Sequence, residues 1–301
     1  MKQHILITGA TGMIGKKLIA GLLRKGHNLS ILTRKPIKIK DVKVFLWNVE
    51  KGEIDKSCLM GVQTIVHLAG AGIAEQKWTK ERKKQIIDSR VASTELLYKT
   101  ISETASTVKN FISSSASGYY GDRDDEILLE NNAPGEGFLA ECCTLWENAV
   151  DVGKELNLRI VKFRTGFVLG KSGSGLTSLA RPIRLFAGAA LGTGKQWVPW
   201  IHVDDIAAMY MSAIDDDSYE GAYNGCAPNP VTNEMLTKAV AKKLNRPVWP
   251  INVPEKVLEM ILGKMSIIVT SSTNLSAQKI LDKGFNFNFV HLADALDEIY
   301  N

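Results

Sequence analysis

The stretch TGATGMIG, from Thr8 to Gly15, decides the fold. It follows HILIT, a short run of β-branched residues and leucine that is typical of a parallel strand covered on both faces. It leads into MIGKKLIAGLLRKGH, where apolar and basic side chains alternate with helical spacing and Gly26 supplies the C-terminal stop. NLSILTR, at Asn28–Arg34, is predicted to be a second strand, which completes a βαβ unit of the ~30 residues that such a crossover requires.

Gly9, Gly12 and Gly15 form GxxGxxG directly between this strand and this helix. One glycine makes the tight turn, one lets a ligand approach the backbone, and one lets the helix pack closely on the strand. Backbone N–H groups at the start of the helix can then face the pyrophosphate of a dinucleotide. The residues predicted to contact the cofactor at this turn are Gly9, Thr11, Gly12, Met13, Ile14 and Gly15.

The end of the second strand indicates which dinucleotide binds. An NAD enzyme usually presents an acid there to the ribose 2′-hydroxyl, whereas this sequence has Thr33, Arg34 and Lys35. We therefore predict NADP(H), with Arg34 stacking on adenine or pairing with the 2′-phosphate. The alternative is that Arg34 and Lys35 are solvated loop charges.

Composition narrows the class of protein. The chain has 301 residues, 45% hydrophobic and 23% charged, which fits one large α/β domain or a nucleotide domain with a smaller lobe. The net charge of +5 is spread along the chain, and runs such as Lys80–Lys84 are predicted to be solvated, so a small-molecule substrate is expected rather than nucleic acid. No stretch reaches the ~18 apolar residues of a membrane-spanning helix, so we expect no membrane partner.

Cysteine usage points to a reducing compartment. Cys58, Cys142, Cys143 and Cys226 have no zinc-ligand spacing, and adjacent cysteines rarely form a disulfide with each other. We expect reduced, largely buried thiols, no metal site and a cytoplasmic location. The apolar run at the N-terminus is too short for a secretory signal.

Strand and helix patterns alternate along the first half of the chain, which predicts an α/β fold: a Rossmann-type, doubly wound parallel sheet with helices on both faces and a smaller C-terminal substrate lobe. Residues 1–170 are predicted to form the NADP(H)-binding domain, ending in one long strand, LRIVKFRTGFVLG, at Leu158–Gly170. Residues 171–301 are assigned mainly to the substrate lobe, with a late strand near 222–227 returning to the first domain.

Motifs along nearly the whole chain resemble those of atypical short-chain dehydrogenases/reductases, close to epimerase-family proteins often described as nucleoside-diphosphate-sugar epimerases. Besides the glycine turn, they include HLAGAGI (His67–Ile73), SSASGYYG (Ser114–Gly121), FRTGFVLG (Phe163–Gly170) and GTGKQWVPWIHVDD (Gly192–Asp205). The resemblance implies that the nicotinamide lies in the cleft between the two lobes. It also implies further cofactor contacts from the ends of the later strands, at Ala69, Gly70, Ser113, Ser114 and Arg164.

Typical members of this superfamily use a tyrosine as acid/base, and a lysine one helical turn later lowers its pKa and holds the ribose. In FLAECCTLWE the corresponding positions are Leu139 and Cys143, so that pair is missing. The candidate replacements are Ser115, as a hydrogen-bond donor to a substrate oxygen, and Tyr119 or Tyr120, as a relocated proton donor. For the tyrosines, packing of the rings against a loop is the alternative.

Five residues are candidates for contact with substrate. Arg90 is expected to face an anionic group or to brace a helix end, and Gln196 to hydrogen-bond the substrate. Trp197 and Trp200 are expected to wall the pocket or to fill a core. His202, in WIHVDD, is expected to cap a helix or to act in catalysis.

Two functions fit these observations. The first is an NADP(H)-dependent oxidoreductase or epimerase that acts on a small polar substrate, for example a nucleotide-linked sugar, by hydride transfer. The second is a non-catalytic NADP(H)-binding sensor or scaffold, which the missing tyrosine–lysine pair favours. The sequence leaves a homodimer open.

Overall fold

The computed structural model describes residues 2–171, 173 and 175–301. Within these residues the central sheet has the order β12-β8-β6-β5-β1-β2-β3-β4, in which all neighbours are parallel except β3 and β4. Its strands are β1 (His4–Thr8), β2 (Asn28–Thr33), β3 (Val42–Asn48), β4 (Glu53–Ile54), β5 (Thr64–His67), β6 (Asn110–Ala116), β8 (Arg159–Thr165) and β12 (Gly221–Gly225). The predicted Rossmann-type fold is confirmed.

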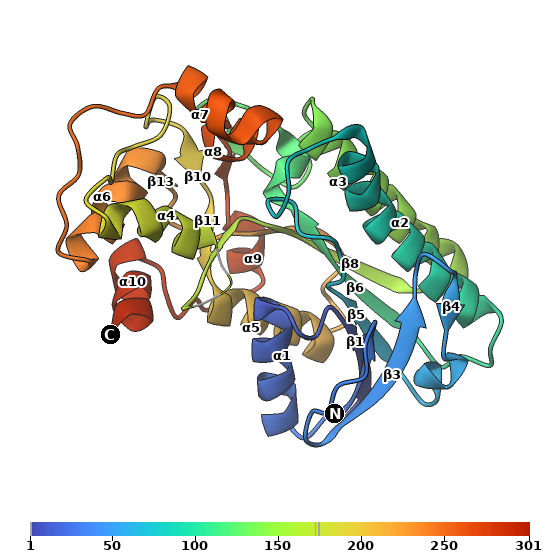
Figure 1. Cartoon of the computed structure of the whole chain (residues 1–301). Coiled ribbons are helices and arrows are strands. Elements are labelled where there is room, and N and C mark those ends of the chain that lie inside the picture. The colour runs from blue at the N-terminus through green and yellow to red at the C-terminus, as the bar shows by residue number, and fades with distance from the viewer. Residues whose placement is uncertain (1, 172, 174) are drawn as a thin grey trace.

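Helices cover both faces of the sheet (Figure 1). On one face lie α1 (Met13–Arg24) and α5 (Val203–Asp215), and on the other lie α2 (Lys80–Ser102) and α3 (Phe138–Asp151). Alternate residues of β1 show this directly, because Ile5 and Ile7 belong to the core under α1 and α5, whereas Leu6 belongs to the core under α2 and α3. Both faces of the sheet are therefore buried, which explains the continuous apolar strands.

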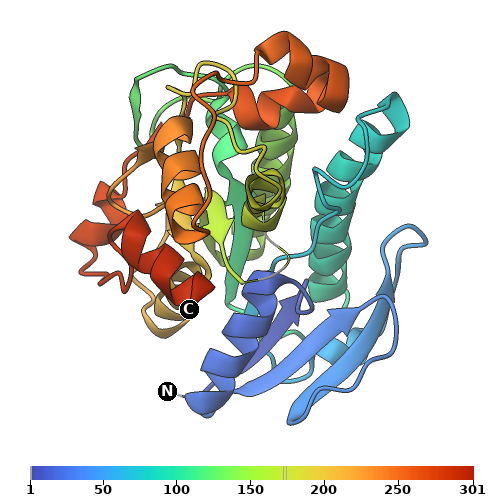
Figure 2. The same ribbon diagram turned by 60° about the vertical axis from the view of Figure 1, so that its left-hand side comes forward.

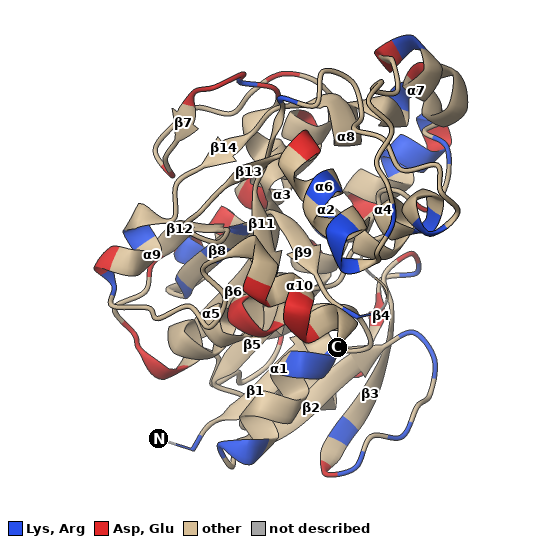
Figure 3. Ribbon diagram, turned by 90° about the vertical axis from the view of Figure 1, so that its left-hand side faces the viewer, with Lys and Arg blue, Asp and Glu red and all other residues tan. Residues whose placement is uncertain are grey.

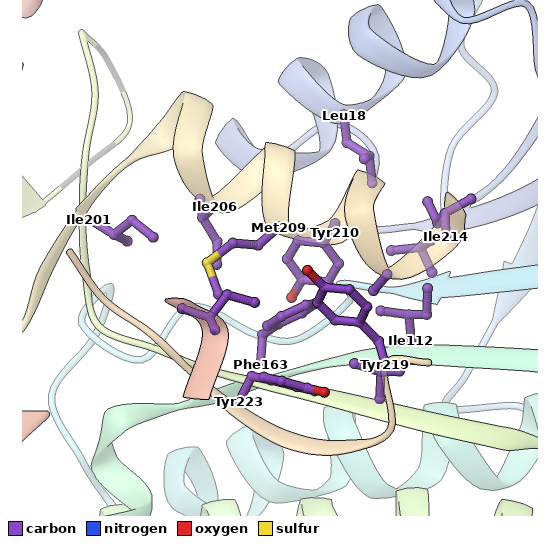
Figure 4. Close-up of a cluster of buried hydrophobic side chains, with 14 of the residues drawn as sticks. Leu18, Ile112, Phe163, Ile201, Ile206, Met209, Tyr210, Ile214, Tyr219 and Tyr223 are labelled. Carbon is purple, nitrogen blue, oxygen red and sulfur yellow. The ribbon is translucent and has the colours of Figure 1, made fainter. Parts of the chain in front are cut away.

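The core under α5 is rich in aromatic rings (Figure 4). Phe163 of β8 meets the ring of Tyr210 on α5 edge to face, with centroids 4.7 Å apart. The Tyr210 hydroxyl pairs with Ser114 Oγ of β6 at 2.6 Å, so this buried polar group is satisfied.

A third apolar cluster, which includes Leu176, Trp200 and Leu296, lies outside the two cores that cover the central sheet. The C-terminal helices gather beside the sheet (Figure 2). The helices that contribute to this cluster are α4 (Gly175–Arg184), α6 (Asn233–Lys243) and α10 (Leu292–Tyr300). Of the other helices in this part of the chain, α7 (Glu255–Leu262), α8 (Ile267–Thr270) and α9 (Gln278–Asp282), the last packs on the core under α1 and α5 through Ile280. Three short strand pairs lie outside the central sheet: β7 (Ile127–Leu128) with β14 (Asn274–Leu275), β9 (Phe167–Leu169) with β11 (Trp200–His202), and β10 (Trp197–Val198) with β13 (Val231–Thr232). Turns of 3-10 helix lie at Lys56–Leu59, Ser117–Tyr120, Val152–Leu156 and Gly263–Ser266.

The long strand expected at Leu158–Gly170 is two strands, so that prediction is wrong. β8 ends at Thr165, and after Gly166 the chain leaves the central sheet as β9, which pairs with β11. A side chain at Gly166 would clash with the Pro199 carbonyl oxygen, to which Phe167 N–H also donates. The break is thus set by a segment that the local sequence does not contain.

Charges are interspersed over the face seen in Figure 3. The ion pair between Lys17 of α1 and Asp204 of α5, at 2.7 Å, joins neighbouring helices. Among the residues that the structure describes, we find no helix with the length and apolar character needed to cross a membrane.

The strand order places a ligand crevice at the carboxyl ends of β1 and β5. From β1 the chain winds outward through β2 and β3, then returns to β5 on the other side and winds outward again. In open α/β sheets, ligands bind at this point of reversal. TGATGMIG therefore lies at the expected position.

Candidate functional site

The glycine turn brings backbone close to backbone at the crevice. Gly9 has φ +66°, and a methyl group there would lie 2.6 Å from the carbonyl carbon of Leu68, just after β5. A methyl group at Gly15 would lie 2.6 Å from the Gly9 carbonyl oxygen, so α1 can begin close to the turn only because residue 15 is glycine. Thr11 and Gly12 are exposed in front of the helix, and Met13 and Ile14 are half-buried behind them.

The N-terminus of α1 is open to an anion. Gly12 is the N-cap, no side chain accepts a hydrogen bond from the first turn, and that turn holds no acidic residue. The first N–H groups of a helix have no partner within the helix, and the helix dipole adds partial positive charge. This cradle fits a pyrophosphate, and the approach of Gly9 and Gly15 leaves no space for larger residues.

A buried histidine fixes the two strand ends that meet here. The Thr8 hydroxyl accepts hydrogen bonds from the N–H groups of Leu68 and Ala69, at 3.2 and 3.1 Å, so its own proton is directed to His67 Nδ1, 2.8 Å away. His67 Nε2 then donates to Ser93 Oγ of α2, at 3.0 Å. Burial is the main cause that lowers the pKa of His67 to about 3, and the charge of Arg90 acts in the same direction.

Two cations stand free at the adenosine side of the crevice. Arg34 and Lys35, just beyond β2, are exposed, and neither side chain has a hydrogen bond or ion pair within the described part of the chain. A depression of about 360 Å³ separates this loop from α1 and is lined by Ala10, Thr11, Lys16, Ile19, Ile37 and Ile39. Apolar walls beside free cations suit an adenosine that bears a phosphate.

The three serines at the end of β6 point in different directions. Ser113 is buried and donates to the Ser114 carbonyl oxygen, and Ser114 pairs with Tyr210. Ser115 is 3% exposed and donates its proton to Glu147 Oε1 of α3, at 2.7 Å. In this geometry Ser115 can accept a hydrogen bond, but it has no free proton to give to a substrate oxygen.

Glu147 lies in a buried ionic network. Arg164 of β8 forms two hydrogen bonds with its carboxylate, Nε to Oε1 at 2.8 Å and Nη2 to Oε2 at 3.0 Å, and Lys162 Nζ lies 3.3 Å from Oε2. Burial works to raise the pKa of the Glu147 carboxyl, but Arg164 and Lys162 together hold it below its usual value. Arg164 is therefore largely occupied by protein groups.

The two adjacent tyrosines have different environments. Tyr120 is fully buried, donates to Asn224 Oδ1 at 2.7 Å and accepts from Arg164 Nη1 at 2.9 Å, and burial raises its pKa to about 12. Tyr119 is half-buried, with its ring centroid 3.5 Å from the Arg164 guanidinium carbon. Its hydroxyl has no hydrogen-bond partner among the described residues, so only Tyr119 of this pair offers a free phenol.

Comparison with known proteins agrees with the arrangement of this crevice. The model of the NAD dependent epimerase/dehydratase family matches residues 5–224. The chain belongs to this family. A second model, a domain of unknown function (DUF1731), matches residues 253–299, which include α7, α8, α9 and all of α10 but its last residue.

Relatives of the family extend over the whole chain. Epimerase family protein SDR39U1 homolog, chloroplastic, of Arabidopsis thaliana is 35% identical, covering 99% of this chain and 87% of its own length. Epimerase family protein YfhF of Bacillus subtilis is 32% identical, covering 99% of this chain and 98% of its own. The crystal structure of human epimerase family protein SDR39U1 with NADPH has a TM-score of 0.86 at 27% identity and covers 99% of both chains. The fold is thus the nicotinamide-dinucleotide-binding fold of the epimerase family.

The positions where the superfamily carries its tyrosine and lysine face the end of β6. A methyl group at Gly118, in the turn after β6, would lie 3.1 Å from Leu139 Cβ and 3.8 Å from Cys143 Sγ. Burial raises the pKa of Cys143 to about 12, so its thiol stays neutral. All four cysteines are buried and free, as the sequence predicted.

Four of the residues considered for substrate contact are engaged by the protein. Gln196 Nε2 donates to the carbonyl oxygens of Leu191 and Val269. Trp197 Nε1 donates to Asp125 Oδ1. Trp200 is fully buried and donates to the Asn229 carbonyl oxygen, and His202 is fully buried, caps α5 through Asp204 N–H and pairs with Glu298.

The fifth, Arg90, lies at the crevice beside Gly70. A methyl group at Gly70 would lie 3.1 Å from its guanidinium carbon. Ala69 is half-buried and Gly70 is exposed, and both lie within three residues of the end of β5.

Sequence reasoning assigned no role to His67 or Glu147. Both have a recognisable signal, because each is an ionisable residue in an otherwise apolar buried pattern, His67 in TIVH and Glu147 on the inner face of α3. Their partners come from other elements and could not be read from the sequence alone.

Proposed function

We propose that this protein binds NADP(H) and transfers hydride between the cofactor and a small polar carbonyl or alcohol substrate. The observation that carries the proposal is the combination of an open, glycine-lined helix N-terminus at the reversal of the sheet with two unpaired cations at the end of β2. When bound, the cofactor supplies or accepts the hydride at C4 of its nicotinamide.

Arg34 and Lys35 support NADP(H) over NAD(H). A 2′-phosphate adds negative charge where these two side chains have no partner among the residues that the structure describes, and a guanidinium pairs with phosphate through two hydrogen bonds. The human relative whose structure has NADPH bound is consistent with this choice. Side-by-side titration of NADPH and NADH tests it, and equal affinities would contradict it.

Tyr119 is the proposed proton donor for the substrate oxygen. Ser115 gives its proton to Glu147 and Tyr120 gives its proton to Asn224, whereas the Tyr119 hydroxyl is free at the end of β6. Arg164 supplies positive charge beneath the Tyr119 ring.

The test is NADPH oxidation with a panel of small carbonyl compounds, comparing the native protein with Tyr119→Phe. The variant keeps the stacked ring and loses only the hydroxyl, so we expect kcat to fall on the order of 100-fold with NADPH affinity unchanged. Full activity in the variant would exclude Tyr119 as the donor.

A second function is favoured by one specific observation: the places of the missing tyrosine and lysine hold Leu139 and neutral Cys143, and Ser115 is engaged by Glu147. A non-catalytic NADP(H) sensor needs only the binding half of the site. Absence of turnover by NADPH-saturated protein across the carbonyl panel would support the sensor and exclude hydride transfer to those compounds.

A reducing compartment such as the cytoplasm is part of the proposal, supported by four buried thiols with no disulfide among the described residues. The Arabidopsis relative is named as chloroplastic. Fractionation of the source cells, followed by immunodetection of the protein, tests the compartment.

A further inference from the structure

Arg90 of α2 is a partly buried cation that no carboxylate neutralises in the described part of the chain. Its Nη1 donates to the carbonyl oxygens of Ala71, at 3.1 Å, and Ile86, at 2.8 Å. Nε and Nη2 form no hydrogen bond with described residues, although the side chain is partly buried and burial lowers its pKa. Charges removed from water in proteins are normally paired, which makes an unpaired guanidinium an indicator of a ligand.

Two contacts hold the free side of this guanidinium at the crevice. Its carbon lies 5.0 Å from the ring centroid of Trp146 on α3, so the indole supports one face. A methyl group at Gly70 would lie 3.3 Å from Nη2, and Gly70 is exposed just beyond β5. A ligand that passes over Gly70 therefore meets Nη2.

Arg90 also reaches the place where the superfamily lysine would stand. Helices α2 and α3 lie side by side on the same face of the sheet (Figures 1 and 2). The guanidinium packs on Trp146, which is about one helical turn after Cys143 on α3, and its positive charge also opposes the rise in the pKa of the Cys143 thiol that burial causes. A cation of α2 thus lies against the part of α3 that lacks the superfamily lysine.

The strand order decides which half of a dinucleotide passes Arg90. With the pyrophosphate at the start of α1, the adenosine end lies toward β2 and Arg34, and the other end lies toward β5 and β6. Gly70, Cys143 and Arg90 are all on that second side.

We propose that Arg90 is a cofactor-binding residue that holds the oxygen-rich nicotinamide-ribose phosphate half of NADP(H), in place of the superfamily lysine. This inference rests on the proposed function, because it requires NADP(H) in the crevice. It changes the expectation that Arg90 faces substrate.

The experiment measures the dissociation constants of NADPH and of adenosine 2′,5′-bisphosphate, which contains the adenosine end and lacks the nicotinamide half. The proteins are the native chain, Arg90→Gln, Arg90→Lys and Arg34→Ala. Loss of charge-assisted hydrogen bonds predicts about ten-fold or weaker NADPH binding by Arg90→Gln, with bisphosphate binding within about two-fold of native. Arg90→Lys keeps the charge and is expected to recover most of the NADPH affinity, whereas Arg34→Ala weakens both ligands.

Three results would overturn the assignment. Native NADPH affinity in Arg90→Gln would show that the guanidinium does not touch the cofactor. Equal loss of both ligands, or a loss that Arg90→Lys does not reverse, would show that Arg90 only braces the site. Failure of the native protein to bind the bisphosphate and NADPH would instead contradict the proposed function itself, so the two failures are distinguishable.

Returning the charge to α3 gives a second, independent readout. If Arg90 supplies the positive charge that a lysine at position 143 would supply, the double variant Arg90→Gln/Cys143→Lys should bind NADPH more tightly than Arg90→Gln alone. If the double variant folds but binds NADPH no more tightly than Arg90→Gln, the result would contradict the idea that Arg90 replaces the superfamily lysine. Should the double variant not fold, the comparison of the two ligands decides the proposal.

Discussion

His67 makes the cofactor crevice sensitive to acid in a way that can be measured. The fold holds its ring neutral, because Thr8 donates to Nδ1 and leaves no acceptor there for a second ring proton. Burial, as the main cause, lowers the pKa of His67 from its ordinary value of 6.5 to about 3. Below pH 6.5 the unfolded chain binds a proton that the folded protein does not, so the free energy of unfolding falls as the pH decreases.

The size of this effect follows from the two pKa values. Each pH unit between 6.5 and 3 is worth about 1.4 kcal/mol, so the contribution of His67 is complete above pH 6.5 and about 3 kcal/mol of it is lost by pH 4.

Urea unfolding at pH 7 and pH 4 tests the prediction on the native protein and His67→Gln. The variant is expected to be less stable at pH 7, since it loses the bonds to Thr8 and Ser93, but to lose about 3 kcal/mol less between the two pH values. His291→Gln, at an exposed position, is the control and should keep the native difference. The reasoning is refuted if His67→Gln and the native protein lose equal stability on acidification.

Three other predictions concern the ends of the crevice and its buried network. Arg34→Ala should weaken NADPH binding about ten-fold and leave NADH binding unchanged, whereas the control Lys38→Ala, on the same loop, should change neither affinity. Calorimetric titration measures both affinities, and an equal loss of NADPH and NADH affinity in Arg34→Ala would contradict the 2′-phosphate contact. Gly15→Ala should weaken NADPH binding at least ten-fold, because the added methyl group would lie 2.6 Å from the Gly9 carbonyl oxygen and displace α1. Native NADPH affinity in this variant would show that the turn tolerates the displacement of α1. Glu147→Gln should lower the free energy of unfolding by about 3–5 kcal/mol, since Arg164 would be left buried with no carboxylate. Urea unfolding measures this change, and a loss below about 1 kcal/mol would show that the ionic network contributes little to stability.

The sequence predicted those parts of the site whose determinants are local. The turn from Thr8 to Gly15 contains its own three glycines and its own helix start, and Arg34 directly follows the second strand, so both positions could be assigned from spacing alone. The exposure of Arg34 follows from its location beyond a strand end, where no apolar pattern requires burial.

The parts that sequence reasoning missed depend on contacts between distant segments. The break at Gly166 is imposed by Pro199, and the proton of Ser115 goes to Glu147, which lies 32 residues later on α3. For Trp200, expected either to wall the pocket or to fill a core, the choice also depends on distant contacts: β11 pairs with β9, and the indole lies in the third apolar cluster. Which residues pair with one another in these contacts cannot be read from the local pattern of either partner.

The distinction between satisfied and unsatisfied polar groups separates structural from ligand-binding residues along this crevice. Ser115 and Arg164 are satisfied by protein groups, and a ligand could engage them only by breaking buried bonds. Four groups along the crevice that have no partner among the described residues lie instead in a row that follows the strand order: Arg34 beyond β2, the first N–H groups of α1 beyond β1, Arg90 Nη2 beside β5 and the Tyr119 hydroxyl after β6. An extended dinucleotide followed by a small substrate presents phosphate, pyrophosphate, ribose and carbonyl oxygens in that order, so one ligand pair would satisfy every one of these groups.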